Sequence, residues 1–181
     1  VRSKRMVSFA QRHLAVMTFE VTLLDEEAPI AISSHLLNRQ AGLDEYRANP
    51  SPDVIADPRK GNRIEARVLE PRLQYTEGDV IVLGYQTANS KMTLATAMEH
   101  TVEFDGEYDV VTEVENDYAK QVFRARAEPG QTFTLTKVVS YHTSSLVPPR
   151  ELADRCHRTL DRVMGEGIEN QFEAQRAWFA D

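Results

Sequence analysis

The chain has 181 residues, a formal net charge of −7 at pH 7, 27% charged residues and 41% hydrophobic residues. This composition is sufficient for one domain with a real core, or for one domain with a helical appendage. The negative charge, with no basic cluster after Arg2, Lys4 and Arg5, argues against binding to nucleic acid. No apolar run approaches the roughly 18–20 residues that a membrane helix needs, so a membrane is not an expected partner either.

The single cysteine, Cys156, excludes an intrachain disulfide. A lone thiol is typical of a reducing compartment, and we therefore predict a cytoplasmic protein. The chain starts at Val1 rather than at Met and shows no signal peptide. We interpret it as an excised piece of a longer protein and leave open how much precedes it.

Alternating apolar and polar residues predict β-strands along most of the chain. The stretch from Arg5 to Gln40 predicts three consecutive strands with very short connections. Further strands are predicted over residues 64–75, 80–86, 92–104, 108–114, 118–126 and 132–142. Pro71 indicates an edge strand or a bulge, because proline cannot donate to a β-ladder. About eight to ten antiparallel strands joined by short turns predict a mostly β fold, with a large sandwich over residues 1–146.

The composition changes at Pro148-Pro149, and residues 147–181 predict two helices that form a linker. In the first helix, one apolar stripe contains Leu152, Cys156, Leu160 and Val163, and Gly165 is the expected C-terminal stop. In the second, the apolar face contains Ile168, Phe172 and Phe179, with Trp178 beside it. This face has no evident partner in the sequence. Two interpretations remain: the helix folds back on the sandwich, or its natural partner lies outside the chain.

Residues that could carry chemistry are few. None of the five histidines has metal-ligand spacing, and the sequence contains neither a phosphate-binding glycine loop nor a nucleophile elbow. His100 lies among apolar residues of its strand and is predicted to be a core or interface histidine. His13 and His35 flank strand ends, where a structural hydrogen bond is the leading interpretation. We therefore assign no catalytic residue, no metal ligand and no cofactor.

Five sequence motifs occur in a fixed order along the chain. They are Val-Ser-Phe-Ala-x-x-His-Leu-Ala at 7–15, Phe-Glu-Val-Thr at 19–22, Ile-Ser-Ser-x-Leu-x-Asn-Arg-Gln at 32–40, Asp-Pro-Arg-Lys at 57–60 and Tyr-x-Thr-Ala-Asn-Ser-x-Met-Thr-Leu at 85–94. In order and spacing the chain resembles the N-terminal domain of glycoside hydrolase family 65. That family contains the maltose, trehalose and kojibiose phosphorylases and their hydrolase relatives.

The resemblance implies a galactose-mutarotase-like β-supersandwich. It also implies that the catalytic glutamate and the phosphate-binding residues belong to a following barrel of helical hairpins, beyond Asp181. The chain would then be a non-catalytic domain of an enzyme that acts on α-glucosidic disaccharides, inactive alone. Its partners would be the catalytic barrel of the same chain and the oligosaccharide substrate, and a homodimer is an assembly that this domain could support.

The long polar stretch from Asn38 to Arg63 has no helical or strand periodicity. At roughly 25 residues it exceeds the usual loop length, and such loops are commonly functional. Polar side chains near its ends are the candidate interdomain or sugar-facing residues: His35, Asn38, Arg39, Asp57, Arg59 and Lys60. Plain anchoring of the loop by Arg39 or Arg59 is the competing interpretation.

Two other functions remain as alternatives. One is an autonomous carbohydrate-binding module. The other is a sugar epimerase of the mutarotase type, which would need His100 together with either His13 or His35, and a nearby acid, in one open groove. Convergence of these histidines in a solvent-reachable cleft would favour the epimerase.

Overall fold

A computed structural model describes residues 1–38 and 67–180 of the chain. Its elements are β1 (Arg2–Val7), β2 (Leu14–Thr22), β3 (Ala28–Leu37), β4 (Leu69–Glu77), β5 (Val80–Thr87), β6 (Thr93–Glu103), β7 (Tyr108–Glu115), β8 (Tyr118–Ala127), β9 (Thr132–Ser144), α1 (Pro149–Glu166) and α2 (Ile168–Trp178). In the described ranges no helix is long and apolar enough to cross a membrane.

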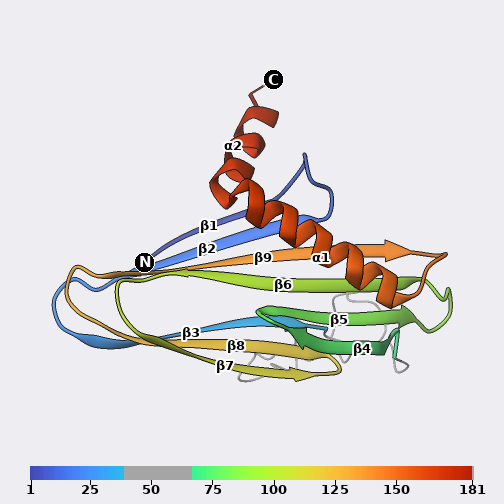
Figure 1. Cartoon of the computed structure of the whole chain (residues 1–181), viewed down its shortest axis with the longest axis horizontal. Coiled ribbons are helices and arrows are strands. Elements are labelled where there is room, and N and C mark those ends of the chain that lie inside the picture. The colour runs from blue at the N-terminus through green and yellow to red at the C-terminus, as the bar shows by residue number, and fades with distance from the viewer. Residues whose placement is uncertain (39–66, 181) are drawn as a thin grey trace, which may run out of the picture.

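The strands form two antiparallel sheets that face each other (Figure 1). The large sheet has the order β1-β2-β9-β6-β5-β4, and the small sheet has the order β3-β8-β7. This arrangement confirms the predicted mostly β sandwich followed by two C-terminal helices. The division into domains at residue 146 stays a prediction. In the structure, α1 shares a core with the large sheet.

The chain crosses between the two sheets several times. β2 pairs with β9 in the large sheet, whereas β3, only a short turn later, pairs with β8 in the small sheet. The strands predicted over residues 108–114 and 118–126 are observed as β7 and β8, and they form a hairpin in which Glu115 pairs with Tyr118. The prediction from Pro71 is also confirmed, since β4 is an edge strand whose register shifts between Pro71 and Leu73.

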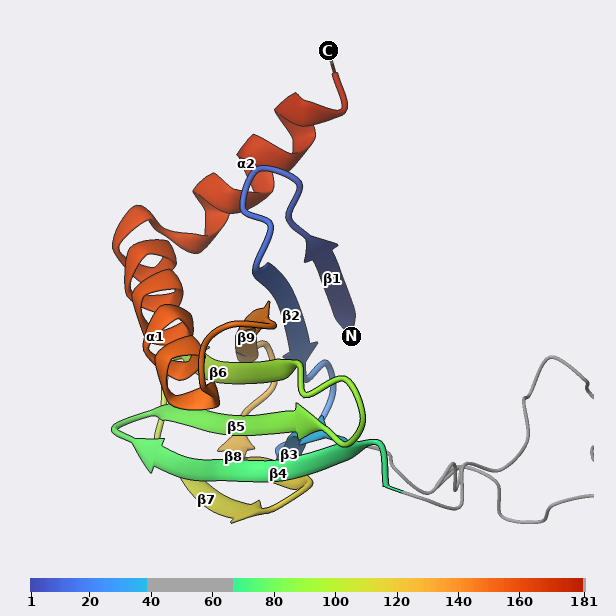
Figure 2. The ribbon, with the colours of Figure 1, turned by 90° about the vertical axis from the view of Figure 1, so that its right-hand side faces the viewer.

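Helix α1 covers the outer face of the large sheet (Figures 1 and 2). Its predicted apolar stripe is fully buried there, against side chains such as Val16, Val82 and Val138. The large sheet is therefore the partner of this stripe. The predicted stop is wrong: Gly165 lies inside the helix, and Gly167 ends it with a φ of 89°, a conformation that favours glycine.

The contact between the sheets forms the rest of the core. One cluster gathers Phe123 of the small sheet with Phe133 and Leu135 of the large sheet. A second cluster joins Met98 and Ile81 to Ala119. Met98 and His100 face the same side of β6, toward the small sheet. The core thus has two layers of contact, one under α1 and one between the sheets.

Helix α2 folds back only in part. Phe172 is buried, and the Lys4 ammonium lies 5.6 Å from the centroid of its ring. The connection between β1 and β2 meets the end of the helix, where Phe9 contacts the rings of Trp178 and Phe179. These three aromatic residues remain mostly exposed. Of the two interpretations, folding back is the one observed in the described residues, although much of the apolar surface stays in water.

Candidate functional site

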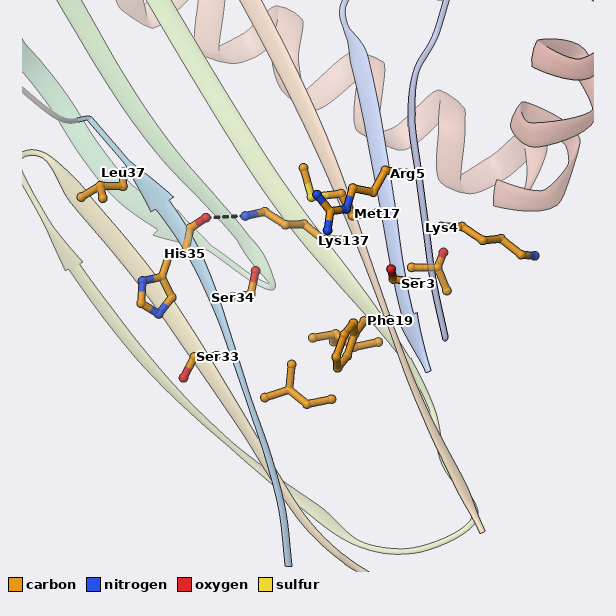
Figure 3. A pocket seen from close by; sticks show the side chains of 13 residues that line it. Ser3, Lys4, Arg5, Met17, Phe19, Ser33, Ser34, His35, Leu37 and Lys137 are labelled. Atoms are coloured by element: carbon orange, nitrogen blue, oxygen red, sulfur yellow. Dashed lines mark hydrogen bonds between the residues drawn. The ribbon is translucent and has the colours of Figure 1, made fainter. Parts of the chain in front are cut away.

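A groove of about 760 Å³ opens between the two sheets, on the side of β1 and β2 (Figure 3). We call it the inter-sheet groove. It exists because the sheets differ in width: β3 is the last strand of the small sheet on this side, whereas the large sheet continues through β2 and β1. In Figure 2, β1 and β2 rise away from the small sheet. The inner face of these two strands is therefore only partly covered.

The register of the large sheet decides which side chains reach the groove. Arg5 pairs with Met17, which pairs with Lys137, and Ser3 and Phe19 form the next row along β1 and β2. Side chains alternate between faces along a strand, so residues in these rows share the inner face. Met17 is 44% exposed and Phe19 is 38% exposed. Two large apolar side chains on the inner face of the large sheet are thus partly exposed to solvent. They lie beside the cationic side chains of Arg5 and Lys137.

Lys137 joins the two sheets across the groove. Its Nζ donates a hydrogen bond to the backbone carbonyl of His35 on β3, as Figure 3 shows. Burial lowers the pKa of Lys137 to about 8. Because this pKa lies above 7, Lys137 is still protonated in most molecules at pH 7. Within the described parts of the chain, no Asp or Glu lines the groove to balance Lys137 and Arg5.

His100 lies behind Lys137, in the contact between the sheets. Its Nε2 is 2.7 Å from the Ser34 hydroxyl, and its ring lies 5.1 Å from the ring of Phe123. Burial lowers the pKa of His100 to about 4, with a further lowering by the charge of Lys137. The prediction of a core or interface histidine is confirmed. Its Nδ1 is buried, with no hydrogen-bond partner of standard geometry among the described residues.

Two of the six predicted site residues belong to the described part of the chain. His35 is exposed on β3, and its ring meets that of Tyr118 edge to face, with centroids 5.5 Å apart. Asn38 lies just after β3, where its side-chain amide donates to Asp117 Oδ1 at 3.0 Å. Arg39, Asp57, Arg59 and Lys60 lie outside the described residues, so their proposed roles stay predictions.

Asp117 holds together the two ends of the described chain that flank residues 39–66. It accepts hydrogen bonds from Asn38 on one side and from the Arg67 guanidinium on the other. Nearby, the hydroxyl of Tyr85 donates to the Asn116 carbonyl at 3.0 Å, and burial raises the pKa of Tyr85 to about 12. The sequence predicts strands on either side of Asn116 and Asp117, but it contains no signal for these long-range partners.

The other histidines have separate surroundings. His13 stacks on His142 with ring centroids 3.9 Å apart, and His142 Nε2 is 3.1 Å from the Thr159 hydroxyl. His100 instead contacts Ser34 and Phe123, and His35 contacts Tyr118. Among the described residues, no contact joins His13, His35 and His100. The structure therefore does not supply the histidine constellation that a mutarotase-type epimerase would need.

The comparisons with known proteins agree with this architecture. Residues 1–181 match the Glycosyl hydrolase family 65, N-terminal domain. The match covers the whole chain, and the chain therefore belongs to this family, which confirms the resemblance noted from its motifs.

Similar proteins are much longer than this chain. An uncharacterized glycosyl hydrolase of Mycobacterium tuberculosis is 26% identical over 100% of this chain and 22% of its own length. An alpha,alpha-trehalose phosphorylase of Thermoanaerobacter brockii is 26% identical over 93% of this chain and 21% of its length. A solved structure from the human microbiome, assigned as a kojibiose phosphorylase, shares the fold with a TM-score of 0.74 and 13% identity. The superposition covers 97% of this chain and 20% of that one.

Proposed function

We propose that this domain is a non-catalytic part of a family 65 phosphorylase or hydrolase that acts on α-glucosidic disaccharides. It would pack on the helical-barrel catalytic domain of the same polypeptide and shape the mouth of the active site. The chain spans about one fifth of the relatives it matches, and one of these is a trehalose phosphorylase. That length leaves room in the relatives for a separate catalytic domain.

The lining of the inter-sheet groove is the observation that carries the non-catalytic part of the proposal. Cleavage of a glycosidic bond by glycoside hydrolases ordinarily uses two carboxyl groups that flank the bond. The described residues that line the groove include Arg5, Lys137, Phe19 and three serines, but no carboxylate. Cations and hydroxyls can bind a ligand, but they do not supply the acid and the base or nucleophile of this reaction.

The test is an activity comparison between the 181-residue chain and the longer protein. Both are incubated with maltose, trehalose and kojibiose, with and without phosphate, and free glucose is measured. We expect glucose release by the longer protein only. Release by the 181-residue chain above the buffer background, abolished by substitution of one of its acids, would overturn the proposal.

An autonomous carbohydrate-binding module is the second candidate, favoured by the exposed ring of Phe19 beside serine hydroxyls in the groove. Apolar ring faces with a few convergent polar groups are typical of small-molecule sites. Titration of the 181-residue chain with the same sugars, by calorimetry, separates this function from the first. Binding that is lost on Phe19→Ala but retained on Phe9→Ala would support the module.

A further inference from the structure

Among the strands that the structure describes, none pairs with the outer edge of β3, the edge that faces away from β8. The pairing with β8 shows which backbone groups of this strand face β8 and which face away from it. The N–H of Asn38 points toward β8, because it donates to the Asp117 carbonyl. The carbonyl of His35 points away from β8, because it accepts a hydrogen bond from Lys137. Along an antiparallel strand these directions alternate. The N–H and C=O groups of Ala31, Ser33 and His35 therefore face the groove rather than β8.

An edge of this length that no described strand covers is unusual for a stable protein. β3 has ten residues, and long free edges invite pairing with another strand. In the described residues, Lys137 is the side chain that bonds to this edge, and it reaches one carbonyl. The neighbouring inner face of β1 and β2 exposes Met17 and Phe19. The edge and the apolar face meet at one place, the inter-sheet groove.

Resting on the proposed function, we propose that the inter-sheet groove seats an additional β-strand from the part of the longer polypeptide outside residues 1–181. This strand hydrogen-bonds to the outer edge of β3, covers Met17 and Phe19 with apolar side chains, and places a carboxylate beside Arg5 and Lys137. It extends the small sheet by one strand, which makes the two sheets more equal in width. Strand addition to an exposed edge is a common mode of peptide recognition.

Charge and chain length favour this occupant. The groove holds two cationic side chains and no described carboxylate, so a strand that carries an acid is complementary to it. A second copy of this chain, paired through β3 about a two-fold axis, would bring Arg5 and Lys137 of both copies into one interface. The relatives have about four fifths of their length outside the matched region, which is ample for one strand.

A small anion is a weaker occupant on the same observations. It could neutralise Arg5 and Lys137, but it would leave the backbone groups of Ser33 unpaired and Phe19 in water. A free sugar could cover Phe19 and bond to the edge, but it would not balance the two charges. A strand satisfies the edge, the apolar face and the cations together.

The test is amide hydrogen exchange in the longer protein, resolved to single residues of β3. We expect the outer amides of Ala31, Ser33 and His35 to exchange as slowly as the β8-facing amides of Ile32 and Ser34. A free edge would instead show outer amides at least about tenfold faster than the β8-facing ones. That result would overturn the proposal. Slow exchange that is lost on dilution would assign the groove to a second copy of the chain. Slow exchange that needs added maltose or phosphate would assign the groove to a small ligand. Each of these two results also overturns the proposal.

A pair of matched variants of the longer protein tests the charge. Arg5→Gln should speed exchange of the outer amides about tenfold or more, whereas Arg2→Gln, on the opposite face of β1, should leave it unchanged. Lys137→Met is the second variant if Arg5→Gln fails to fold. Equal exchange in the Arg5 and Arg2 variants would contradict the role of the cation. If the 181-residue chain is inactive but the outer amides exchange fast, the proposed function stands and this inference fails.

Discussion

The side-chain amide of Asn38 donates to Asp117 Oδ1 at 3.0 Å, and the same oxygen accepts from Arg67. One carboxylate in the turn between β7 and β8 thus binds the residues on either side of segment 39–66. Asn38 and Arg67, the described residues that flank this segment, are thus both attached to the small sheet.

We expect Asp117→Ala to destabilise the chain by about 1–2 kcal/mol, because two hydrogen bonds to a charged acceptor are lost at a partly exposed site. Urea unfolding of wild type and variant measures the difference. Asp109→Ala, which removes an exposed carboxylate on β7, is the control and should change stability by less than about 0.5 kcal/mol. Equal effects at the two positions would contradict the anchoring role of Asp117.

Buried histidine should make the fold sensitive to acid. The pKa of His100 is lowered to about 4 in the folded chain, from an ordinary value of 6.5, mainly by burial. Between these values the unfolded state binds more protons, so stability is fully present above pH 6.5 and is lost as the pH falls toward 4. His142, whose pKa is also lowered to about 4, acts in the same direction.

His100→Gln should therefore weaken the decline of stability between pH 6.5 and 4, by up to about 1.4 kcal/mol per pH unit for one proton. Unfolding free energies measured in urea at half-unit pH steps give the slope. His35→Gln, at an exposed position on β3, should leave the slope unchanged. A slope that stays the same in His100→Gln would show that other groups set the acid sensitivity.

The core under α1 should be costly to open. Leu160 is fully buried against the large sheet, so Leu160→Ala should lower stability by about 2–5 kcal/mol through lost burial and a residual cavity. Leu146→Ala is the control, because Leu146 is 92% exposed and its truncation removes neither burial nor packing. Thermal or urea unfolding measures the stability of both variants. A loss below about 1 kcal/mol at Leu160 would mean that α1 docks loosely on the sheet.

Helix α2 should open before the rest of the structure. It is 11 residues long, and its buried side chains are Gln171 and Phe172. Isolated helices of this length are marginal in water, so few contacts oppose its opening. Hydrogen exchange should show the amides of residues 168–178 exchanging well before those of α1 and the strands. Similar protection in α1 and α2 would refute this prediction.

The role of segment 39–66 in the longer enzyme is tested by Arg39→Ala combined with Arg59→Ala. If these side chains face the active-site mouth, the variant should raise KM or lower kcat at least about tenfold, with little change in Tm. Steady-state kinetics and thermal unfolding of the same preparations give both quantities. Unchanged kinetics with a lowered Tm would show that the arginines only anchor the segment.

Local patterns in the sequence were sufficient to predict the main strands and helices of this fold. Alternation predicted β2 and β3, Pro71 predicted the bulge in an edge strand, and the stripe through Leu160 predicted α1. These features depend on neighbours within a few residues along the chain, where strand and helix periods are expressed directly. The motifs, read together, also indicated family 65.

Only the tertiary structure decided how these elements are assembled. Nothing in the alternation of β2 and β3 assigns them to different sheets, because both strands have the same period of two. Lys137 is 102 residues from His35 in the sequence, and Asp117 is 79 residues from Asn38. Such contacts arise from strand order and register, which depend on the free energy of the whole fold. For the same reason the inter-sheet groove could not be predicted: it results from the unequal widths of two sheets.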